Sequence, residues 1–117
     1  MSKNIYWVFS AAINEGSLEQ LKELASTMIE LTQQEAGAIA YEWSLSPDES
    51  ILYVYERYQN SGAALQHLAN VGTCLPKLMQ LVSPIKMDCY GDVSDSFKEA
   101  VKGLPMVYNQ TFNGFHK

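Results

Sequence analysis

The stretch that most constrains the fold is 51–58, a run of residues with high strand propensity and no polar face. Its two sides carry mainly Ile, Leu, Val and Tyr, whereas a solvated sheet face would be polar. We therefore expect both sides of this strand to be covered. A chain of 117 residues can supply helices for one face only, and an identical sheet from a second subunit would cover the other. The sequence thus predicts a homodimer. The alternative is a monomer whose C-terminal segment folds over the second face.

A second predicted strand, 38–45, precedes this one and is also rich in strand-forming residues. The residues between them, 46–50, include Pro, Asp and Ser, which favour a turn. The pattern therefore predicts an antiparallel hairpin. The hairpin and the helix expected after it contain most of the aromatic and ionisable candidates for a site.

The remaining elements follow from hydrophobic periodicity and from residues typical of helix ends. Strands are expected at 5–12 and 85–90, and helices from Ser17 to Gly37, from Asn60 or Ser61 to Gly72, and over 73–82. Capping boxes are predicted at 17–20 and 96–99, the latter opening a C-terminal helix. A last strand is expected over 106–112 and is a candidate to pair with the partner subunit.

This order of elements predicts an α+β protein with a ferredoxin-like βαββαβ fold and an antiparallel sheet, extended by a C-terminal helix and strand. The first strand is apolar enough to lie in the middle of the sheet. There are no internal repeats, linkers or low-complexity tracts, so we expect residues 1–117 to form a single domain.

Composition limits the possible partners. The formal net charge is −5, and the eight Lys and Arg residues are scattered, whereas a nucleic-acid partner would require clustered cations. No apolar run is as long as a membrane span, and the N-terminus enters a strand pattern almost at once, so we expect a cytoplasmic protein. Cys74 and Cys89 have no metal-ligand spacing and are expected to be buried and reduced.

Two motifs resemble a known family. One is GxxxYE at 37–42, and the other is YERYxxSxAALxH at 55–67. Together with the order of elements over about residues 5–90, they resemble the antibiotic biosynthesis monooxygenase family. The resemblance implies a dimeric α+β barrel, in which two ferredoxin-like sheets pack face to face. It indicates the fold more than the reaction.

One branch of that family oxygenates aromatic polyketides or quinols with O2 and without metal, flavin or haem. The resemblance therefore implies a monooxygenase with no cofactor, acting on a small aromatic molecule. Such a site needs an aromatic pocket, a base, and hydrogen-bond donors for a phenolate or enolate oxygen. His67 is the candidate catalytic base. The candidate substrate-binding residues are Trp7, Tyr41, Trp43, Tyr53 and Tyr55.

A second branch of the family degrades haem, with an Asn on the first strand and a Trp and a ligating His in the second helical region. By spacing, these positions fall near Ser10, His67 and Lys77, and none of the three matches. We therefore do not expect a haem site.

The candidate residues also have structural interpretations. Large aromatic residues on strands are usual in a core or a dimer interface. His67 can face a pocket, or it can lie at the margin of its helix stripe in a structural or solvated role. Glu56 is interpreted as an ion-pair or helix-capping partner, not as a catalytic acid. The alternative function is accordingly a non-catalytic ligand-binding or structural dimeric barrel, and the sequence leaves open whether the protein is an enzyme.

Overall fold

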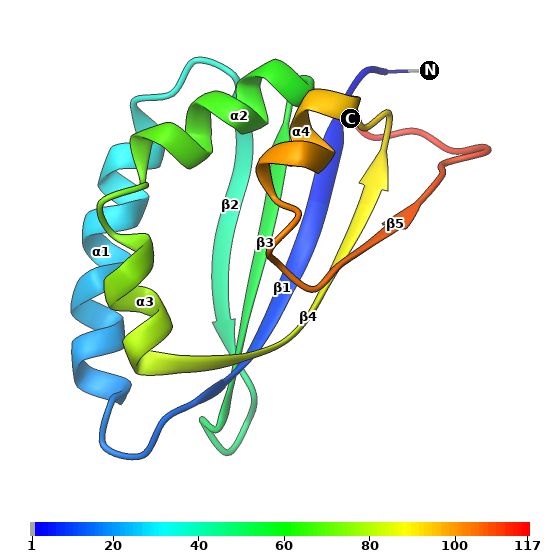
Figure 1. The fold of residues 1–117 in the computed structure, drawn as a ribbon. Helices are drawn as coiled ribbons and strands as arrows, with labels where there is room; N and C mark the ends of the chain where they lie inside the picture. Colours follow the sequence, from blue (N-terminus) through cyan, green and yellow to red (C-terminus); the bar gives the residue numbers. More distant parts are fainter. Residues whose placement is uncertain (1) are drawn as a thin grey trace.

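The computed structural model describes residues 2–117 and places the first strand at the centre of a five-stranded sheet (Figure 1). The strands are β1 (Ile5–Ile13), β2 (Ala38–Leu45), β3 (Ile51–Tyr58), β4 (Val82–Gly91) and β5 (Met106–Asn109). Their order across the sheet is β2-β3-β1-β4-β5. The pairs are antiparallel except for β4 and β5, which are parallel. The predicted ferredoxin-like fold and the central position of β1 are confirmed.

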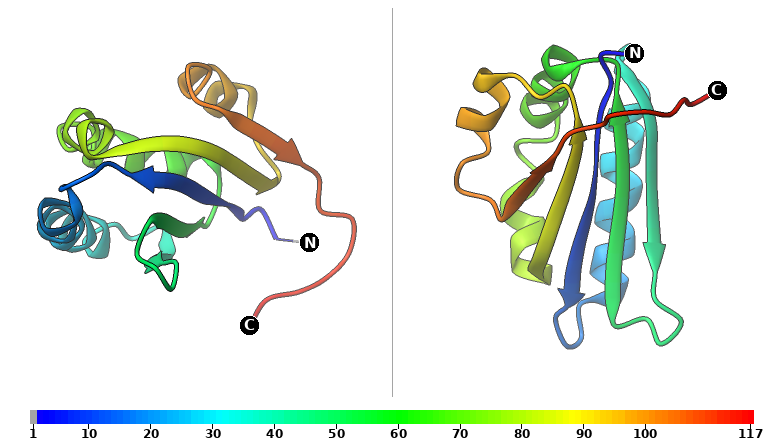
Figure 2. Two further views of the ribbon diagram at one scale, coloured as in Figure 1. Left: turned by 90° about the horizontal axis from the view of Figure 1, so that it is seen from below. Right: turned by 90° about the vertical axis from the view of Figure 1, so that its right-hand side faces the viewer.

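The helices cover one face of this sheet, as Figure 2 shows from two sides. They are α1 (Leu18–Gln33), α2 (Ser61–Asn70), α3 (Leu75–Leu81) and α4 (Asp95–Ala100). None of the described helices has the length and apolar character needed to cross a membrane.

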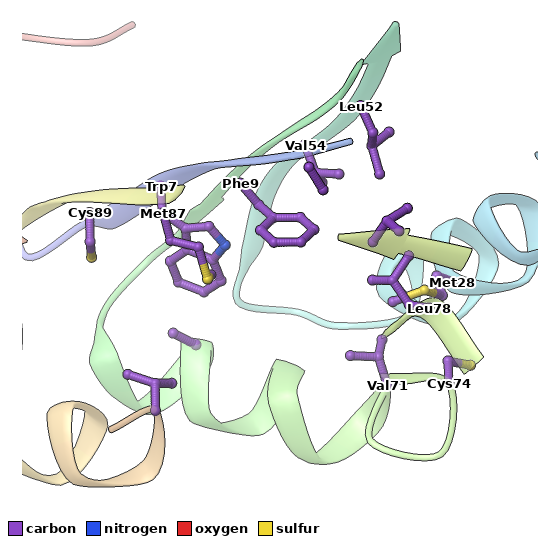
Figure 3. Packing of buried hydrophobic residues seen from close by; sticks show 14 of the residues in the cluster. Trp7, Phe9, Met28, Leu52, Val54, Val71, Cys74, Leu78, Met87 and Cys89 are labelled. Atoms are coloured by element: carbon purple, nitrogen blue, oxygen red, sulfur yellow. The ribbon is translucent and has the colours of Figure 1, made fainter. Parts of the chain in front are cut away.

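The core lies between the sheet and these helices (Figure 3). Phe9, Leu52 and Val54 point from the strands toward Met28 and Val71 on the helix side. Full burial of one side chain of this size contributes about 1.5–3 kcal/mol to folding. Both cysteines are buried, as predicted. Side chains alternate between the two sheet faces along β1 and β3. This alternation therefore determines which of their residues face the helices and can line a site there.

Within residues 2–117, no helix lies on the opposite sheet face (Figure 2). Apolar side chains on it are exposed, including Ile39 on β2 and Tyr53 on β3. Elsewhere on this face Tyr6 and Tyr90 stack at 5.3 Å between ring centroids, and the Arg57 guanidinium lies 4.4 Å from the Tyr6 ring centroid. The structure therefore confirms that the helices of one chain cover a single face of the sheet.

Two predicted capping boxes are wrong. Ser17 precedes α1 but has helical backbone angles (φ −97°, ψ −7°), and its hydroxyl makes no capping hydrogen bond. At α4 the cap lies two residues earlier than predicted, because Ser94 has an extended backbone and its hydroxyl accepts from the Phe97 amide at 3.1 Å. For α2, the side chain of Asn60 accepts from the Ala63 amide at 2.9 Å, which selects Asn60 over Ser61.

The C-terminal half differs from expectation at β4 and β5. Strand β4 begins at Val82, directly after α3, so that Ser83 and Pro84 belong to the strand and do not precede it. Strand β5, the candidate to pair with a partner subunit, lies parallel to β4 of the same chain, with Met106 opposite Met87. It is an edge strand of the sheet in residues 2–117, so pairing of its outer edge with a partner stays a prediction.

Candidate functional site

A cavity of about 320 Å³ lies between the sheet and the helices α2 and α3. Most of its wall is apolar, contributed by side chains such as Phe9, Val54 and Leu78. Few polar side chains interrupt this wall, and these include Glu56 of β3 and His67 of α2. An apolar cavity with a small number of convergent polar groups is the usual form of a small-molecule site.

The structure separates the sequence-predicted site residues into two groups. Trp7, Tyr41, Trp43 and His67 all line the cavity. Tyr53 and Tyr55 do not line it, because they alternate with Leu52, Val54 and Glu56 along β3 and therefore point to the opposite face. The four cavity residues therefore lie close together under the helices. Tyr53 and Tyr55 could contact a substrate only if it bound on the open face of the sheet.

The imidazole of His67 is held between two carboxylates. Its Nδ1 atom lies 3.0 Å from Oε2 of Glu35, and its Nε2 atom lies 3.2 Å from Oε1 of Glu56. Glu35 belongs to the turn after α1, whereas Glu56 belongs to β3. His67 is only 2% exposed. Because both carboxylates can accept from the ring only when both nitrogens carry hydrogen, this geometry favours the imidazolium form.

Neighbouring side chains hold the two carboxylates in place. The Tyr58 hydroxyl donates to Oε1 of Glu56 at 2.7 Å, which is the same oxygen that faces His67. One helical turn after His67, the Asn70 side-chain amide donates to Oε2 of Glu35 at 2.8 Å. The Asn70 amide also reaches the Leu31 carbonyl oxygen at 3.0 Å. These contacts connect the end of α1, α2 and β3 around the imidazole of His67.

Burial and charge act in opposite directions on the imidazole. Burial disfavours the charged ring of His67, but the hydrogen bonds and charges of Glu56 and Glu35 outweigh it and raise the pKa of His67 above its ordinary value. For Tyr41 and Tyr58, burial together with the Glu56 carboxylate raises the pKa of the hydroxyl. Both tyrosines therefore remain uncharged phenols at neutral pH.

Aromatic rings enclose the imidazole. The Tyr41 ring meets it edge-on, with 5.2 Å between centroids, and the Tyr58 ring lies at 4.9 Å. Trp43 packs edge-on against Tyr41 at 5.9 Å. This packing limits the movement of the ring of His67 and lowers the local dielectric constant, so that charges in the cavity act more strongly on a ligand.

Two indole N–H groups of the cavity wall have no protein partner. The Nε1 atoms of Trp7 and Trp43 are buried and make no hydrogen bond within the part of the chain that the structure describes. An unsatisfied buried donor costs about 1–3 kcal/mol. A ligand with an oxygen at this wall would satisfy a donor, and these indoles are therefore candidate hydrogen-bond donors to an oxyanion.

Sequence reasoning missed Glu35 and Asn70, whereas Glu56 was predicted as an ion-pair or helix-capping partner and does pair with His67. A signal was present for Glu56, since it shares the side of β3 that carries Leu52 and Val54, the side covered by the helices. A charged residue on a buried strand face requires a partner. Glu35 and Asn70 gave no such signal, because their proximity depends on how α2 docks against the end of α1.

A second hollow, of about 710 Å³, lies on the open side, between the N-terminal residues and the C-terminal segment. Its wall includes Arg57, whose Nε atom donates to Oδ1 of Asn4 at 2.8 Å, and whose Nη2 atom lies 2.8 Å from Nδ1 of His116. Phe112 and Phe115 of this segment are more than four-fifths exposed. This hollow is formed by an exposed segment and does not include the residues around His67.

The amino-acid sequence matches one family model. Residues 5–77 match the model described as antibiotic biosynthesis monooxygenase. Among curated proteins, no sequence matches the chain at a significant level. The family match covers β1 to the start of α3, including every residue around the imidazole.

Solved structures share the fold. MupZ from Pseudomonas fluorescens superposes with a TM-score of 0.90 at 20% identity, covering 100% of this chain and 91% of that one. A protein from Shewanella oneidensis gives a TM-score of 0.68 at 28% identity, covering 77% of this chain and 91% of its own. SnoaB, a cofactor-independent oxygenase from Streptomyces nogalater, gives 0.66 at 11% identity, covering 75% and 91%.

Proposed function

Because the chain belongs to the antibiotic biosynthesis monooxygenase family, we propose that it is a cofactor-independent monooxygenase that uses O2 to oxidise an aromatic polyketide-like or quinol-like small molecule. The observation that carries this proposal is the buried imidazole of His67 between two carboxylates, at the wall of an aromatic cavity. That arrangement places a proton-accepting carboxylate, that of Glu56, at the wall of a mainly apolar cavity.

The reaction requires such an acceptor. A base removes a proton from the substrate, and the electron-rich anion that remains reduces O2. The substrate and oxygen combine to a peroxide anion, which takes up a proton and then loses water. For a CH2 carbon, one oxygen atom ends in the new carbonyl group, and the other leaves as water with the two hydrogens. Atoms and electrons balance without a further reductant.

The cavity residues have distinct roles in this proposal. His67, the base candidate of the sequence, is the centre of a proton-accepting group in which its imidazolium pairs with the carboxylates of Glu35 and Glu56. Trp7, Tyr41 and Trp43 form the aromatic wall against which a planar substrate stacks. The unpartnered indole N–H groups donate to the phenolate or enolate oxygen that develops after deprotonation.

The proposed active form is a homodimer in the cytoplasm, with residues 1–117 acting as one domain. The open sheet face carries exposed Tyr53 and Ile39, and a second copy would cover them. In this proposal Tyr53 and Tyr55 belong to the dimer surface. The substrate cavity lies on the other side of the sheet, under the helices.

Oxygen uptake with a panel of naphthols, anthrones and reduced quinones tests this function. We expect uptake with at least one of these compounds, and a large loss of uptake in His67→Ala. Lys77→Ala is a suitable control, because Lys77 is an exposed residue of α3 that does not line the cavity. Binding without uptake across the panel would instead favour the non-catalytic ligand-binding alternative.

A further inference from the structure

We propose that Glu56 is the residue that exchanges a proton with the substrate, and that His67 and Glu35 are positioning residues behind it. This inference rests on the proposed function and assigns the proton transfer to one atom, Oε2 of Glu56. Sequence reasoning had placed the proton on His67 and had given Glu56 a structural role.

His67 has no nitrogen available to a ligand. Its Nδ1 atom is 3.0 Å from Glu35 and its Nε2 atom is 3.2 Å from Glu56. A general base must come within about 2.6–3.2 Å of the group it deprotonates. Direct transfer to His67 would therefore require one of these two contacts to break.

Glu56, in contrast, has one carboxylate oxygen without a protein partner among the described residues. Its Oε1 atom receives both the Tyr58 hydroxyl, at 2.7 Å, and Nε2 of His67. Within residues 2–117, no hydrogen bond is formed by Oε2 of Glu56. Glu56 lines the cavity and Glu35 does not. Of the two carboxylates, only that of Glu56 is placed to meet a substrate.

The charge of the group also favours proton uptake by Glu56. One imidazolium between two carboxylates leaves one negative charge uncompensated. The other groups that surround the imidazole, Tyr41 and Tyr58, are uncharged phenols, and in the described residues no Lys or Arg forms an ion pair with either carboxylate. An unpaired charge in an apolar cavity is unfavourable. Uptake of a substrate proton on Glu56 would neutralise the group.

The proton balance follows from this placement. Oε2 of Glu56 forms a bond to the substrate proton, and the electron pair of the broken C–H or O–H bond stays on the substrate. After oxygen has added, Glu56 returns the proton to the peroxide. His67 keeps its two hydrogen bonds throughout and holds Oε1 of Glu56 in place.

Proton transfer can be measured separately from oxygenation. In deuterated buffer under nitrogen, the acidic CH2 hydrogens of anthrone should exchange faster with the protein than in buffer alone, as followed by mass spectrometry. We expect Glu56→Gln to slow the protein-dependent exchange about 100-fold or more. The matched control is Glu42→Gln, because Glu42 is an exposed glutamate on the neighbouring strand β2 that does not line the cavity.

The positioning residues should behave differently from Glu56. In Glu35→Gln, exchange should remain within about tenfold of the wild type, and the pH profile of the exchange rate should move, because the charge next to His67 is removed. Quenching of the fluorescence of Trp7 and Trp43 by anthrone reports binding in every variant, since both indoles line the cavity.

The outcomes are distinct. Slow exchange in Glu56→Gln with unchanged anthrone binding supports the assignment. Undiminished exchange in Glu56→Gln, or no acceleration by the wild type, overturns it. Exchange without oxygen uptake leaves the assignment of Glu56 in place and overturns only the oxygenase proposal. If Glu56→Gln does not fold, Glu56→Asp withdraws the carboxylate by one methylene group, and an unchanged exchange rate at unchanged binding would overturn the assignment.

Discussion

Nδ1 of His67 lies 3.0 Å from Oε2 of Glu35, which joins the middle of α2 to the turn that follows α1. Both side chains are almost completely buried. The contact forms between residues far apart in the chain, and it sets both the orientation and the charge of the imidazole. The site and the packing of two helices therefore depend on the same interaction.

The pH dependence of stability should reflect this interaction. Glu35 and Glu56 are the charged groups that face His67, and Tyr41 and Tyr58 are its uncharged titratable neighbours. Since the folded protein raises the pKa of His67, the stabilisation is complete below pH 6.5, its ordinary pKa, and is lost as the pH rises through the raised pKa. Denaturant unfolding between pH 6 and pH 9 should show a falling free energy of unfolding.

In His67→Gln, the free energy of unfolding should not show this decrease between pH 6 and pH 9. The variant should also be about 3–5 kcal/mol less stable at pH 6, since it leaves two buried carboxylates without their cation. Parallel pH profiles of the wild type and His67→Gln would contradict the assigned charge state.

Position 37 should not tolerate a side chain, because α2 packs closely against Gly37. An ideal Cβ atom there would lie 2.5 Å from Cβ of Ala63 in the first turn of α2. We expect Gly37→Ala to lower the free energy of unfolding by about 1–3 kcal/mol, because the helix would have to move away from β2. Gly103→Ala is the control, since a Cβ atom at Gly103 meets nothing within 4 Å.

Ala63→Gly should offset part of the stability loss caused by Gly37→Ala. Ala63→Gly removes the Cβ atom that causes the clash, so that the Gly37→Ala/Ala63→Gly double variant should be more stable than the sum of the two single changes. Additive losses in thermal or denaturant unfolding would show that the two positions do not meet.

Trp43 should contribute to ligand binding through its N–H group. Its Nε1 atom is buried without a partner among the described residues, so Trp43→Phe breaks no intramolecular hydrogen bond while it keeps an aromatic ring. Loss of one hydrogen bond to a ligand oxygen is worth about 0.5–1.5 kcal/mol, or roughly 3- to 10-fold in the dissociation constant for anthrone. Tyr53→Phe, on the open face, should leave that constant unchanged; equal effects in the two variants would argue against the cavity as the binding site.

The open sheet face should mediate self-association. Sedimentation velocity at micromolar concentration should give a dimer, and Tyr53→Arg should shift the protein toward the monomer, because it places like charges from two copies on an apolar interface. Lys22→Ala, on the helix side, is the control. A stable monomer for the wild type would rule out the proposed dimer surface.

The fold could be predicted from sequence because local signals and tertiary packing agree. The alternation within β1 and β3, the turn at 46–50 and the apolar stripes of the helices all specify the same α+β order. Two kinds of detail were not predicted: the local capping residues of α1 and α4, and the arrangements that depend on contacts with distant parts of the chain. The parallel pairing of β5 with β4 was not predicted, because it follows from how α4 packs, which periodicity does not encode.

The site was only partly predictable for the same reason. Trp7, Tyr41, Trp43 and His67 were selected by residue type, and the structure places all of them around one cavity. Tyr53 has the same residue type but points to the other face, so residue type alone does not select the cavity residues. Glu35 could not be found, because nothing in the sequence relates the end of α1 to the middle of α2.

We propose that this cavity supports oxygenation that begins with proton transfer to Glu56, which His67 holds in place. The most direct measurement is turnover of anthrone under oxygen-18 gas, with mass spectrometry of the product from the wild type and from Glu56→Gln. We expect one labelled oxygen atom in the wild-type product, the second labelled atom in water, and no enzyme-dependent product from Glu56→Gln. Unlabelled product, or equal labelling by both proteins at equal rates, would contradict it.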